Sequence, residues 1–342
     1  MEKIRVGVVG AAGYAGEELL RLLLRHDRVE ITAITSRKNA GSPVETVFPR
    51  FTGSGLTFVE PSAEDLAKKC DVAFLALPHG LAAEYAIPLL KFGVKVIDIS
   101  ADFRLRSTAK YEEYYGVPHP EPELLKEAVY GQPERYREAL KGARLVACAG
   151  CYPTSIILAS APLLASKLVK PTNIVASSMS GVTGAGRKVD LAYIFPECNE
   201  SLKAYKVCGH RHLPEIEQEL AAAAGVDEIA MNFIPHLVPA NRGINSTILF
   251  DAAEGCTLEK IEEVYHKAYD NEQFVRVLPA KKCSDTKYVT MTNVCEIGFN
   301  YDAHTNKVIV TSVIDNLTKG ASGQAIQCMN IMFGFPESTG LL

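Results

Sequence analysis

The stretch that decides the fold is residues 4–16, IRVGVVGAAGYAG, which runs directly into residues 17–24, EELLRLLL. The first part is a short β-branched strand pattern that ends in glycine, and the second has the apolar spacing of a helix. Strand, glycine turn and helix form the context that a dinucleotide-binding fingerprint requires. Glycine at position 10 permits a tight turn, and glycine at 13 lets the backbone approach a pyrophosphate at the helix N-terminus. The residues expected to line the cofactor here are Gly10, Ala12, Gly13, Tyr14 and Ala15.

The second strand of this domain bears on the choice of cofactor. Residues 29–35, VEITAIT, are followed by Ser36, Arg37 and Lys38. A site that prefers NAD usually carries an acidic residue near this point, whereas a hydroxyl and two cations suit a 2′-phosphate. We therefore predict NADP(H) as the cofactor. The alternative is a solvated basic loop.

Composition sets the class of protein. The chain has 342 residues, of which 47% are hydrophobic and 22% charged, which suffices for two domains with cores of their own. The net charge of −4 argues against a nucleic-acid partner, and no apolar run reaches the length of a transmembrane span. The nine cysteines form no disulfide framework, which predicts a reducing, cytoplasmic location. A signal peptide at the amino end is disfavoured by its glycines.

The order of predicted elements changes half-way along the chain. Strands at 71–77, 94–99 and 145–149 alternate with helices, which predicts an α/β, Rossmann-type, doubly wound parallel sheet. Later strands at 173–180, 231–238 and 244–250, with a hairpin at 294–301 and 308–315, predict an α+β domain with a largely antiparallel sheet. We place the NADP-binding domain at 1–149 with 316–342. The catalytic and oligomerisation domain is then 150–315.

A cysteine lies where the first pattern ends. Gly150-Cys151-Tyr152-Pro153-Thr154 follows a predicted strand, and proline suits the first position of a helix. Unpaired N–H groups at a helix N-terminus favour a thiolate, so Cys151 is the candidate nucleophile. The plain alternative is a small buried residue at a turn. A redox pair or half a zinc site with Cys148 is disfavoured, because Cys148 lies in the apolar strand and no second pair has the right spacing.

The histidines of residues 209–216, GHRHLPEI, are the candidate acid/base groups. In an extended segment His210 and His212 would lie on one face, and Glu215, at the start of a predicted helix, would orient one imidazole. The sequence leaves open which histidine serves. A metal site built on these three side chains is disfavoured, because no further ligand cluster appears, and we predict no metal.

Four motifs, read together, resemble the N-acetyl-γ-glutamyl-phosphate reductase family, within the wider semialdehyde dehydrogenases. They are residues 10–16, GAAGYAG; 98–105, DISADFRL; 150–154, GCYPT; and 209–216, GHRHLPEI. The resemblance covers essentially the whole chain and implies NADPH-dependent reduction of an acyl phosphate through a cysteine thioester, in arginine biosynthesis. It also implies release of inorganic phosphate and a homodimer or homotetramer. Related acyl-phosphate reductases, such as the carrier-linked aminoadipate enzyme or aspartate-semialdehyde dehydrogenase, remain alternatives. So does an NADP-binding regulator, which would not need Cys151.

The resemblance also guides the remaining site residues. Arg104 follows a strand and is expected to clamp phosphate or carboxylate bidentately; the alternative is a salt bridge with Asp102. Further cofactor contacts are assigned to Pro78, His79, Gly181, Gly184 and Asn316. Substrate contacts are assigned to Arg104, Arg187, Lys188 and Arg211.

Overall fold

The computed structural model describes residues 3–342, which form two compact units. The first unit contains the chain up to Ala149 together with Ala321–Leu342, and the second is Gly150–Gly320. The sequence predicted that the chain returns to the first unit at Asn316, whereas in the structure the second unit continues to Gly320. The difference arises because Asp315 and Asn316 accept hydrogen bonds from backbone groups of the second unit, at Met291 and Gly243.

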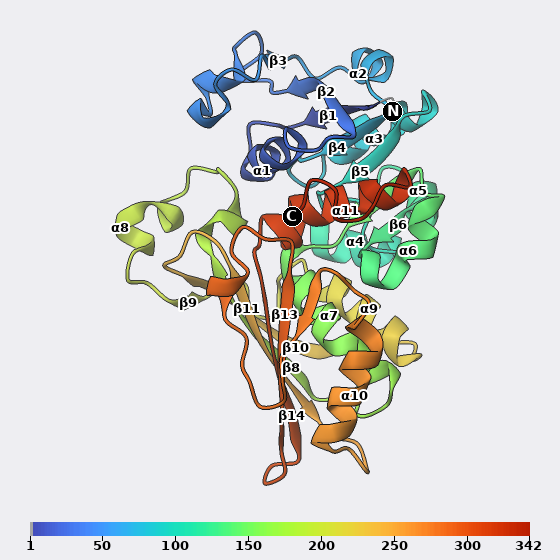
Figure 1. Cartoon of the computed structure of the whole chain (residues 1–342), viewed down its shortest axis with the longest axis vertical. Coiled ribbons are helices and arrows are strands. Elements are labelled where there is room, and N and C mark those ends of the chain that lie inside the picture. The colour runs from blue at the N-terminus through green and yellow to red at the C-terminus, as the bar shows by residue number, and fades with distance from the viewer. Residues whose placement is uncertain (1–2) are drawn as a thin grey trace. The chain divides into compact units, whose positions relative to one another are not determined.

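A seven-stranded sheet forms the middle of the first unit (Figure 1). Its strands, in spatial order, are β3 (Phe58–Val59), β2 (Val29–Thr35), β1 (Ile4–Val9), β4 (Val72–Leu75), β5 (Lys95–Asp98), β7 (Leu145–Cys148) and β6 (Val129–Gly131). Neighbouring strands pair in parallel throughout. The predicted doubly wound sheet is confirmed, with the reversal of strand order between β1 and β4, which is where such sheets bind ligands.

Helices cover both faces of this sheet. α2 (Ala63–Lys69) and α3 (Ala82–Lys91) pack on one face, and α1 (Tyr14–Leu23) and α11 (Gly323–Met332) pack on the other. Every residue of β4 is therefore fully buried, as expected of a parallel sheet with two covered faces. The remaining helices of the unit are α4 (Thr108–Tyr115), α5 (Pro122–Glu127) and α6 (Pro133–Lys141).

The second unit is built on another seven-stranded sheet. Its strands, in spatial order, are β12 (Val275–Val277), β13 (Cys295–Asp302), β14 (Lys307–Ile314), β11 (Ile244–Asp251), β8 (Ile174–Gly181), β10 (Met231–Val238) and β9 (Lys203–Ala204). The central run from β13 to β8 is antiparallel and includes the predicted hairpin, which confirms the prediction of a largely antiparallel sheet. β10, however, pairs in parallel with β8, and β12 pairs in parallel with β13, so the sheet is mixed.

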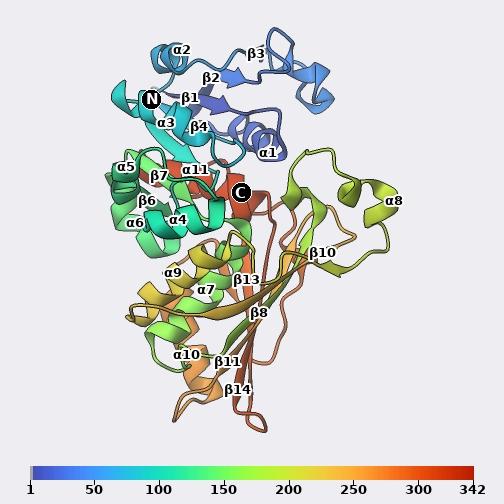
Figure 2. The same ribbon diagram turned by 180° about the vertical axis from the view of Figure 1, so that it is seen from behind.

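Three helices of this unit pack on one face of its sheet: α7 (Cys151–Ala165), α9 (Leu213–Ala224) and α10 (Leu258–Tyr269) (Figures 1 and 2). α7 lies between the sheet and α9, whereas α10 contacts β12 and β13 as well as α7. Most residues of α7 are buried, as expected of a helix covered on several sides. Pro162 has no N–H to offer the carbonyl of Leu158, one turn earlier, and the hydroxyl of Tyr269 donates to that carbonyl instead. α10 therefore holds α7 in place.

The opposite face of this sheet is open. Along β11 fully buried residues alternate with half-buried ones, so one side faces the helices and the other faces outward. A long connection between β8 and β10 carries the short helix α8 (Phe195–Cys198) and several exposed apolar side chains, of which Val189 and Phe195 are the most exposed.

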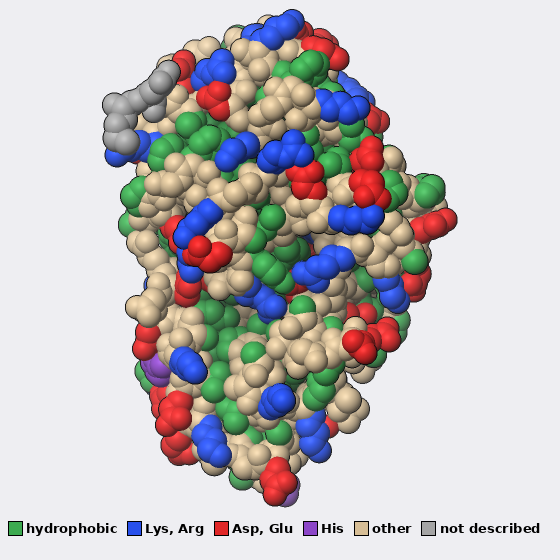
Figure 3. All heavy atoms as spheres, turned by 90° about the vertical axis from the view of Figure 1, so that its right-hand side faces the viewer, with side chains coloured by type: hydrophobic (Ala, Val, Ile, Leu, Met, Phe, Trp, Pro, Cys, Tyr) green, Lys and Arg blue, Asp and Glu red, His purple; other side chains and the backbone are tan. Residues whose placement is uncertain are grey.

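Charges of both signs are spread over the surface. On the face drawn in Figure 3, Lys and Arg side chains are interspersed with Asp and Glu. This face therefore shows no basic stripe of the kind typical of nucleic-acid-binding proteins. No helix among residues 3–342 is long and apolar enough to cross a membrane.

Candidate active site

Cys151 is the first residue of α7, so the helix begins at the cysteine and not at Pro153 as predicted. Gly150 is the N-cap, with an extended backbone, and its N–H donates to Oε1 of Glu215 at 2.8 Å. The thiol, which is partly exposed, thus lies in the first turn, where free N–H groups and the helix dipole favour negative charge.

Gly320 lies against this cysteine, a contact that the sequence analysis missed. A Cβ atom at position 320 would lie 2.8 Å from Cβ of Cys151. Only glycine lets the backbone pass so close to the thiol. Residues Thr318–Ser322 form a turn of π-helix, a distortion that is frequent at functional sites.

The predicted histidines meet in one aromatic cluster. Residues 209–212 form a turn and not an extended segment, but the rings of His210 and His212 still lie 4.9 Å apart between centroids. The ring of Tyr152 stands edge-on to His210 at 5.5 Å, and that of Phe233 does so at 5.3 Å. The hydroxyl of Tyr205, which the sequence analysis did not select, lies 3.5 Å from Nε2 of His210.

This cluster keeps His210 uncharged. Burial, together with the nearby cations Lys206 and Arg211, lowers the pKa of His210 to about 4. At neutral pH the imidazole is therefore neutral, and it offers one ring N–H and one lone pair.

Glu215 lies in the first turn of α9, at the start of the helix as predicted. Its carboxylate is buried and accepts the N–H of Gly150, so it holds the turn that carries Cys151. Its predicted orientation of an imidazole stays a prediction. The sequence signal for Glu215 was its place after the two histidines at the start of a predicted helix.

The glycine turn of the first unit fits a dinucleotide. Gly10 has φ +80°, and a Cβ there would lie 2.4 Å from the carbonyl oxygen of Ala76. Gly13, which has no side chain, is the N-cap of α1, so the helix N-terminus is open to a phosphate. Ala12 lies in the turn, and Tyr14 and Ala15 begin the helix.

The end of β2 carries the residues predicted to select NADP. Oγ of Ser36 accepts from the backbone and side chain of Asn39. The exposed Arg37 donates to the hydroxyl of Tyr85 at 3.2 Å and lies 3.6 Å from a carboxylate oxygen of Glu84. A cation is therefore held at the end of β2, against α3.

A chain of carboxylates shapes the loop after β4, which contains the predicted cofactor residues Pro78 and His79. Asp102 accepts the N–H groups of Gly80 and Ala82 at 2.6 and 2.9 Å. Ser100 connects the backbone of Asp102 to the fully buried Asp98. Its hydroxyl oxygen accepts from the N–H of Asp102, and the Asp98 carboxylate accepts both the N–H and the hydroxyl of Ser100. The alternation Asp-x-Ser-x-Asp was visible in the sequence, but its partners were not.

Asp98 predicts a specific pH dependence of stability. Burial, and then the nearby Asp102 carboxylate, raise the pKa of Asp98 to about 7. A raised pKa means that the contribution to stability is complete below the unfolded-state pKa and is lost as pH rises through 7. We expect Asp98→Asn to remove this loss, roughly 1 kcal/mol per pH unit between pH 5 and 7. Urea unfolding at several pH values measures it.

Asp71→Asn is the matched control for that measurement. Asp71 pairs with Arg5, which lowers the pKa of its carboxyl, so its contribution is lost only at acid pH. If Asp98→Asn and wild type lost stability in parallel from pH 5 to 8, the buried carboxyl would not be the titrating group.

Arg104 is largely buried in the first unit. Its Nε donates to the carbonyl of Cys148 at 2.7 Å, and Nη2 donates to that of Ile99 at 2.9 Å. The guanidinium thus ties the ends of β5 and β7 together. Its carboxylate neighbour in sequence, Asp102, instead binds the loop after β4. The predicted clamp on substrate phosphate stays a prediction.

The glycine-rich segment after β8 is also in place. A Cβ at Gly181 would lie 2.7 Å from backbone atoms of Asn241, so glycine is required where two loops cross. Gly184 is exposed. Of the predicted substrate residues, Arg187 and Lys188 are exposed, Lys188 lies 3.3 Å from Asp190, and Arg211 is half-buried beside the histidines. Their contacts with ligands stay predictions.

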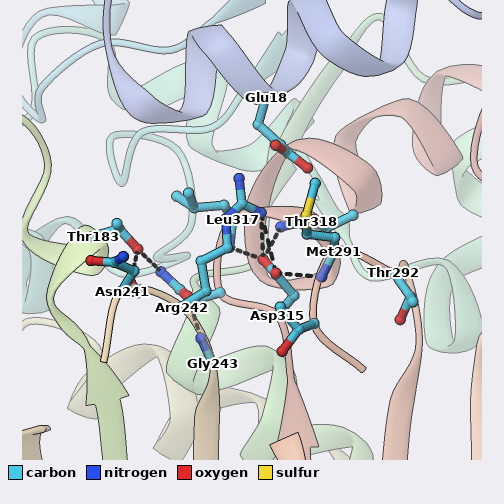
Figure 4. Close-up of polar contacts among 12 residues, drawn as sticks. Glu18, Thr183, Asn241, Arg242, Gly243, Met291, Thr292, Asp315, Leu317 and Thr318 are labelled. Carbon is cyan, nitrogen blue, oxygen red and sulfur yellow. Dashed lines mark hydrogen bonds and ion pairs between the residues drawn. The ribbon is translucent and has the colours of Figure 1, made fainter. Parts of the chain in front are cut away.

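Figure 4 shows a polar centre around Asp315. The buried carboxylate accepts from Nη1 of Arg242 at 3.2 Å and from the N–H groups of Met291 and Leu317 at 2.7 and 2.8 Å. The side chain of the next residue, Asn316, also makes hydrogen bonds within the unit: Oδ1 accepts from the N–H of Gly243, and Nδ2 donates to the hydroxyl of Thr183. Asn316 therefore holds the loops of the second unit together, and its predicted contact with nicotinamide stays a prediction.

All nine cysteines lie within the described residues and are free thiols. Cys148 is fully buried in β7, whereas Cys151 is partly exposed. Within residues 3–342, no group of three or more His, Cys, Asp and Glu side chains is arranged to hold a metal ion.

Two family comparisons match the two units. Residues 5–143 match the NAD binding domain of semialdehyde dehydrogenase, and residues 151–316 match its dimerisation domain. An N-acetyl-gamma-glutamyl-phosphate reductase of Akkermansia muciniphila is 52% identical over 100% of this chain and 99% of its own. The chain belongs to the N-acetyl-gamma-glutamyl-phosphate reductase family, within the semialdehyde dehydrogenases. The reductase of Syntrophobacter fumaroxidans is 51% identical over 99% of this chain and 98% of its own.

Solved structures share the fold at low identity. Aspartate semialdehyde dehydrogenase II of Vibrio cholerae, complexed with ASA, superposes with a TM-score of 0.74 at 16% identity, covering 98% of this chain and 99% of its own. The enzyme of Candida albicans, solved with NADP, gives 0.68 at 16% identity and covers 96% and 98%. The family resemblance expected from the sequence motifs is confirmed.

Proposed function

We propose that this chain is an NADPH-dependent reductase that converts N-acetyl-γ-glutamyl phosphate and releases N-acetylglutamate 5-semialdehyde and phosphate. The observation that carries this proposal is the 52% identity, over the full chain, with a reductase of that name. The position of Cys151 at the N-terminus of α7 supports it, because an acyl-phosphate reductase that works through a thioester needs an activated thiol.

The chemistry follows from the residues around Cys151. The thiolate adds to the carbonyl carbon of the acyl phosphate, the bond to the phosphate oxygen breaks, and an acyl thioester remains on Cys151. The N–H groups of the first turn of α7 favour the thiolate form both before this step and after release of the product. Glu215 keeps the turn in place by its hydrogen bond to Gly150.

The first unit would hold the cofactor. Bound NADPH supplies a hydride for the thioester carbon. Gly10 and Gly13 leave room for the pyrophosphate at the N-terminus of α1, and Ser36 with Arg37 would meet the 2′-phosphate. The loop of Pro78 and His79, held by Asp102, would line the same edge of the sheet.

Cofactor choice is tested at Arg37. We expect Arg37→Ala to weaken NADPH binding by about tenfold or more while NADH binding changes little, because a hydrogen bond to a charged group typically contributes about 1.5–3 kcal/mol. Fluorescence titration with each cofactor measures both constants. Arg25→Ala, which removes an exposed cation of the same unit outside this loop, is the matched control. Equal losses for NADPH and NADH would refute a role of Arg37 in binding the 2′-phosphate.

Substrate choice is tested by the reverse reaction. Phosphate-dependent reduction of NADP with N-acetylglutamate semialdehyde should be fast, and aspartate semialdehyde should be a poor substrate. Preference for aspartate semialdehyde would favour the alternative enzyme. No reduction with either aldehyde, with NADP still bound, would favour a regulator that does not need Cys151.

We also propose that the chain is a homodimer or homotetramer of the cytoplasm. The match of residues 151–316 to a dimerisation domain and the open face of the second sheet, where Met179 is 42% exposed, support self-association. Nine free cysteines support a reducing compartment. Light scattering on the purified protein distinguishes a monomer from a dimer and a tetramer.

A further inference from the structure

His210 belongs to a row of polar groups that ends on the backbone. Nε2 of His210 lies 3.5 Å from the hydroxyl of Tyr205, which lies 3.1 Å from the hydroxyl of Tyr152. The Tyr152 hydroxyl lies 3.3 Å from the carbonyl oxygen of His236 on β10. At the other side of the imidazole, the backbone N–H of His212 donates to Nδ1 of His210 at 3.1 Å.

The directions of the hydrogen bonds in the row follow from its two backbone ends when Tyr152 donates to the carbonyl oxygen of His236. A carbonyl oxygen only accepts, so Tyr152 donates its proton to His236. The oxygen of Tyr152 must then accept from Tyr205, and the oxygen of Tyr205 must accept from His210. A backbone N–H only donates, so Nδ1 of His210 carries the lone pair and the ring proton is on Nε2.

We infer that His210 acts as a neutral imidazole that donates its Nε2–H to the substrate oxygen. Tyr205 and Tyr152 are positioning residues, because their hydroxyls hold the imidazole ring of His210 in its orientation. This inference rests on the proposed function for its substrate. It selects His210 over His212 and gives it the role of a hydrogen-bond donor in place of a base.

The reaction chemistry needs such a donor. Addition of the Cys151 thiolate to the acyl phosphate moves the carbonyl π pair onto oxygen and forms an oxyanion. This oxyanion collapses to the thioester as the phosphate leaves, and the released phosphate takes its proton from solvent. Addition of a hydride, which bound NADPH would supply, to the thioester carbon gives a second oxyanion on that carbon. Its collapse forms the aldehyde, breaks the C–S bond and returns the thiolate. Neither collapse requires a protein base, but both oxyanions are stabilised by a donor.

The surroundings of His210 agree with this role. Burial lowers its pKa to about 4, and protonation at Nδ1 would also set an N–H against the N–H of His212. Burial raises the pKa of both tyrosines, so their hydroxyls keep their protons. The 3.5 Å contact with Tyr205 is the longest in the row, so turning the Nε2–H to a substrate oxygen breaks only a weak bond.

The tautomer is measured directly in the free protein. In protein labelled with ¹⁵N-histidine, long-range ¹H–¹⁵N spectra assign the protonated nitrogen of each imidazole, and loss of signals in His210→Gln identifies His210. We expect a neutral ring with the proton on Nε2 at pH 7, and the same in His212→Asn, because the bond to Nδ1 comes from the backbone. A proton on Nδ1, or a charged ring, would overturn the inference whatever the substrate is.

Two substitutions separate a donor from a base. The side-chain amide of glutamine places an N–H near the position of Nε2 and does not titrate, whereas leucine has no donor. We expect His210→Leu to lower kcat about 10²–10³-fold and His210→Gln to restore most of that loss. If both variants were equally impaired, with the fold intact by circular dichroism, His210 would not act as a donor.

The positioning role is tested by removing single hydroxyls. We expect Tyr205→Phe and Tyr152→Phe to lower kcat roughly two- to tenfold with KM unchanged, and Tyr205→Phe to shift the Nε2–H resonance of His210. Tyr288→Phe, which removes an exposed hydroxyl of the same unit, is the matched control. A loss confined to thermal stability, with an unmoved Nε2–H resonance, would make the tyrosines merely structural.

Discussion

Replacing Cys151 with alanine will abolish acyl-phosphate reduction and leave NADPH binding near its wild-type strength. The thiol forms the covalent bond to the substrate, and alanine offers no nucleophile. Loss of a catalytic nucleophile typically lowers kcat by several orders of magnitude, so we expect a fall below about one-thousandth. The glycine turn that would bind the cofactor lies in the other unit of the chain. Steady-state assays and NADPH titration on the same preparation measure both properties.

Chemical labelling gives an independent test. Iodoacetamide should modify Cys151 before Cys208, although Cys208 is the more exposed thiol, because only Cys151 lies in the first turn of a long helix. Cys208→Ala is the matched control and should keep the labelling at position 151. An alanine variant at 151 that kept a tenth of wild-type kcat would rule out covalent catalysis by this thiol.

The first unit could be predicted from sequence because its signals are local. The β-branched strands alternate with helices, and a parallel sheet with both faces covered is the architecture that buries such strands. The second sheet was predicted less fully. β8 and β10 both have strand patterns, but nothing within either strand states that they run parallel. That pairing follows from the long crossover between them, which includes α9.

The candidate site divides in the same way. Cys151, His210 and His212 lie in motifs of a few residues, so the sequence alone identified them as candidate site residues. Tyr205 was missed because no local motif links it to its partners. Tyr152 is 53 residues earlier in the chain, and His210 approaches Tyr205 only because the chain turns between them. Position in the fold also decides what Glu215 does, since its partner Gly150 is 65 residues earlier.

Arg104 and Asn316 illustrate the converse limit. Each was assigned to a ligand from its motif, and each makes hydrogen bonds to protein atoms. Arg104 donates to carbonyl groups at the ends of two strands, and Asn316 bonds to loops of the second unit. A motif identifies a residue type that a site needs. It does not distinguish a residue that touches the ligand from one that shapes the backbone around it.

Replacing Gly13 with alanine will remove most of the affinity for NADPH without unfolding the protein. The three glycines of the turn differ in what a methyl group would meet. At Gly10 it would lie 2.4 Å from the carbonyl oxygen of Ala76, and at Gly16 it would lie 2.6 Å from the backbone of Ala11. At Gly13 the nearest atom is the carbonyl oxygen of Gly10 at 3.6 Å, an ordinary contact, and φ is −83°.

Gly13→Ala therefore tests cofactor binding separately from the stability of the fold. The added methyl group lies at the N-terminus of α1, where a pyrophosphate must approach the backbone closely. We expect the Kd for NADPH to rise at least about tenfold, or roughly 1.4 kcal/mol, with Tm within about 2 °C of wild type. Gly142→Ala, at an open position of the same unit, should change neither value. Iodoacetamide labelling of Cys151 should also be unchanged, because the thiol is activated by its own helix. Normal NADPH binding by Gly13→Ala would mean that the cofactor lies elsewhere than on this turn.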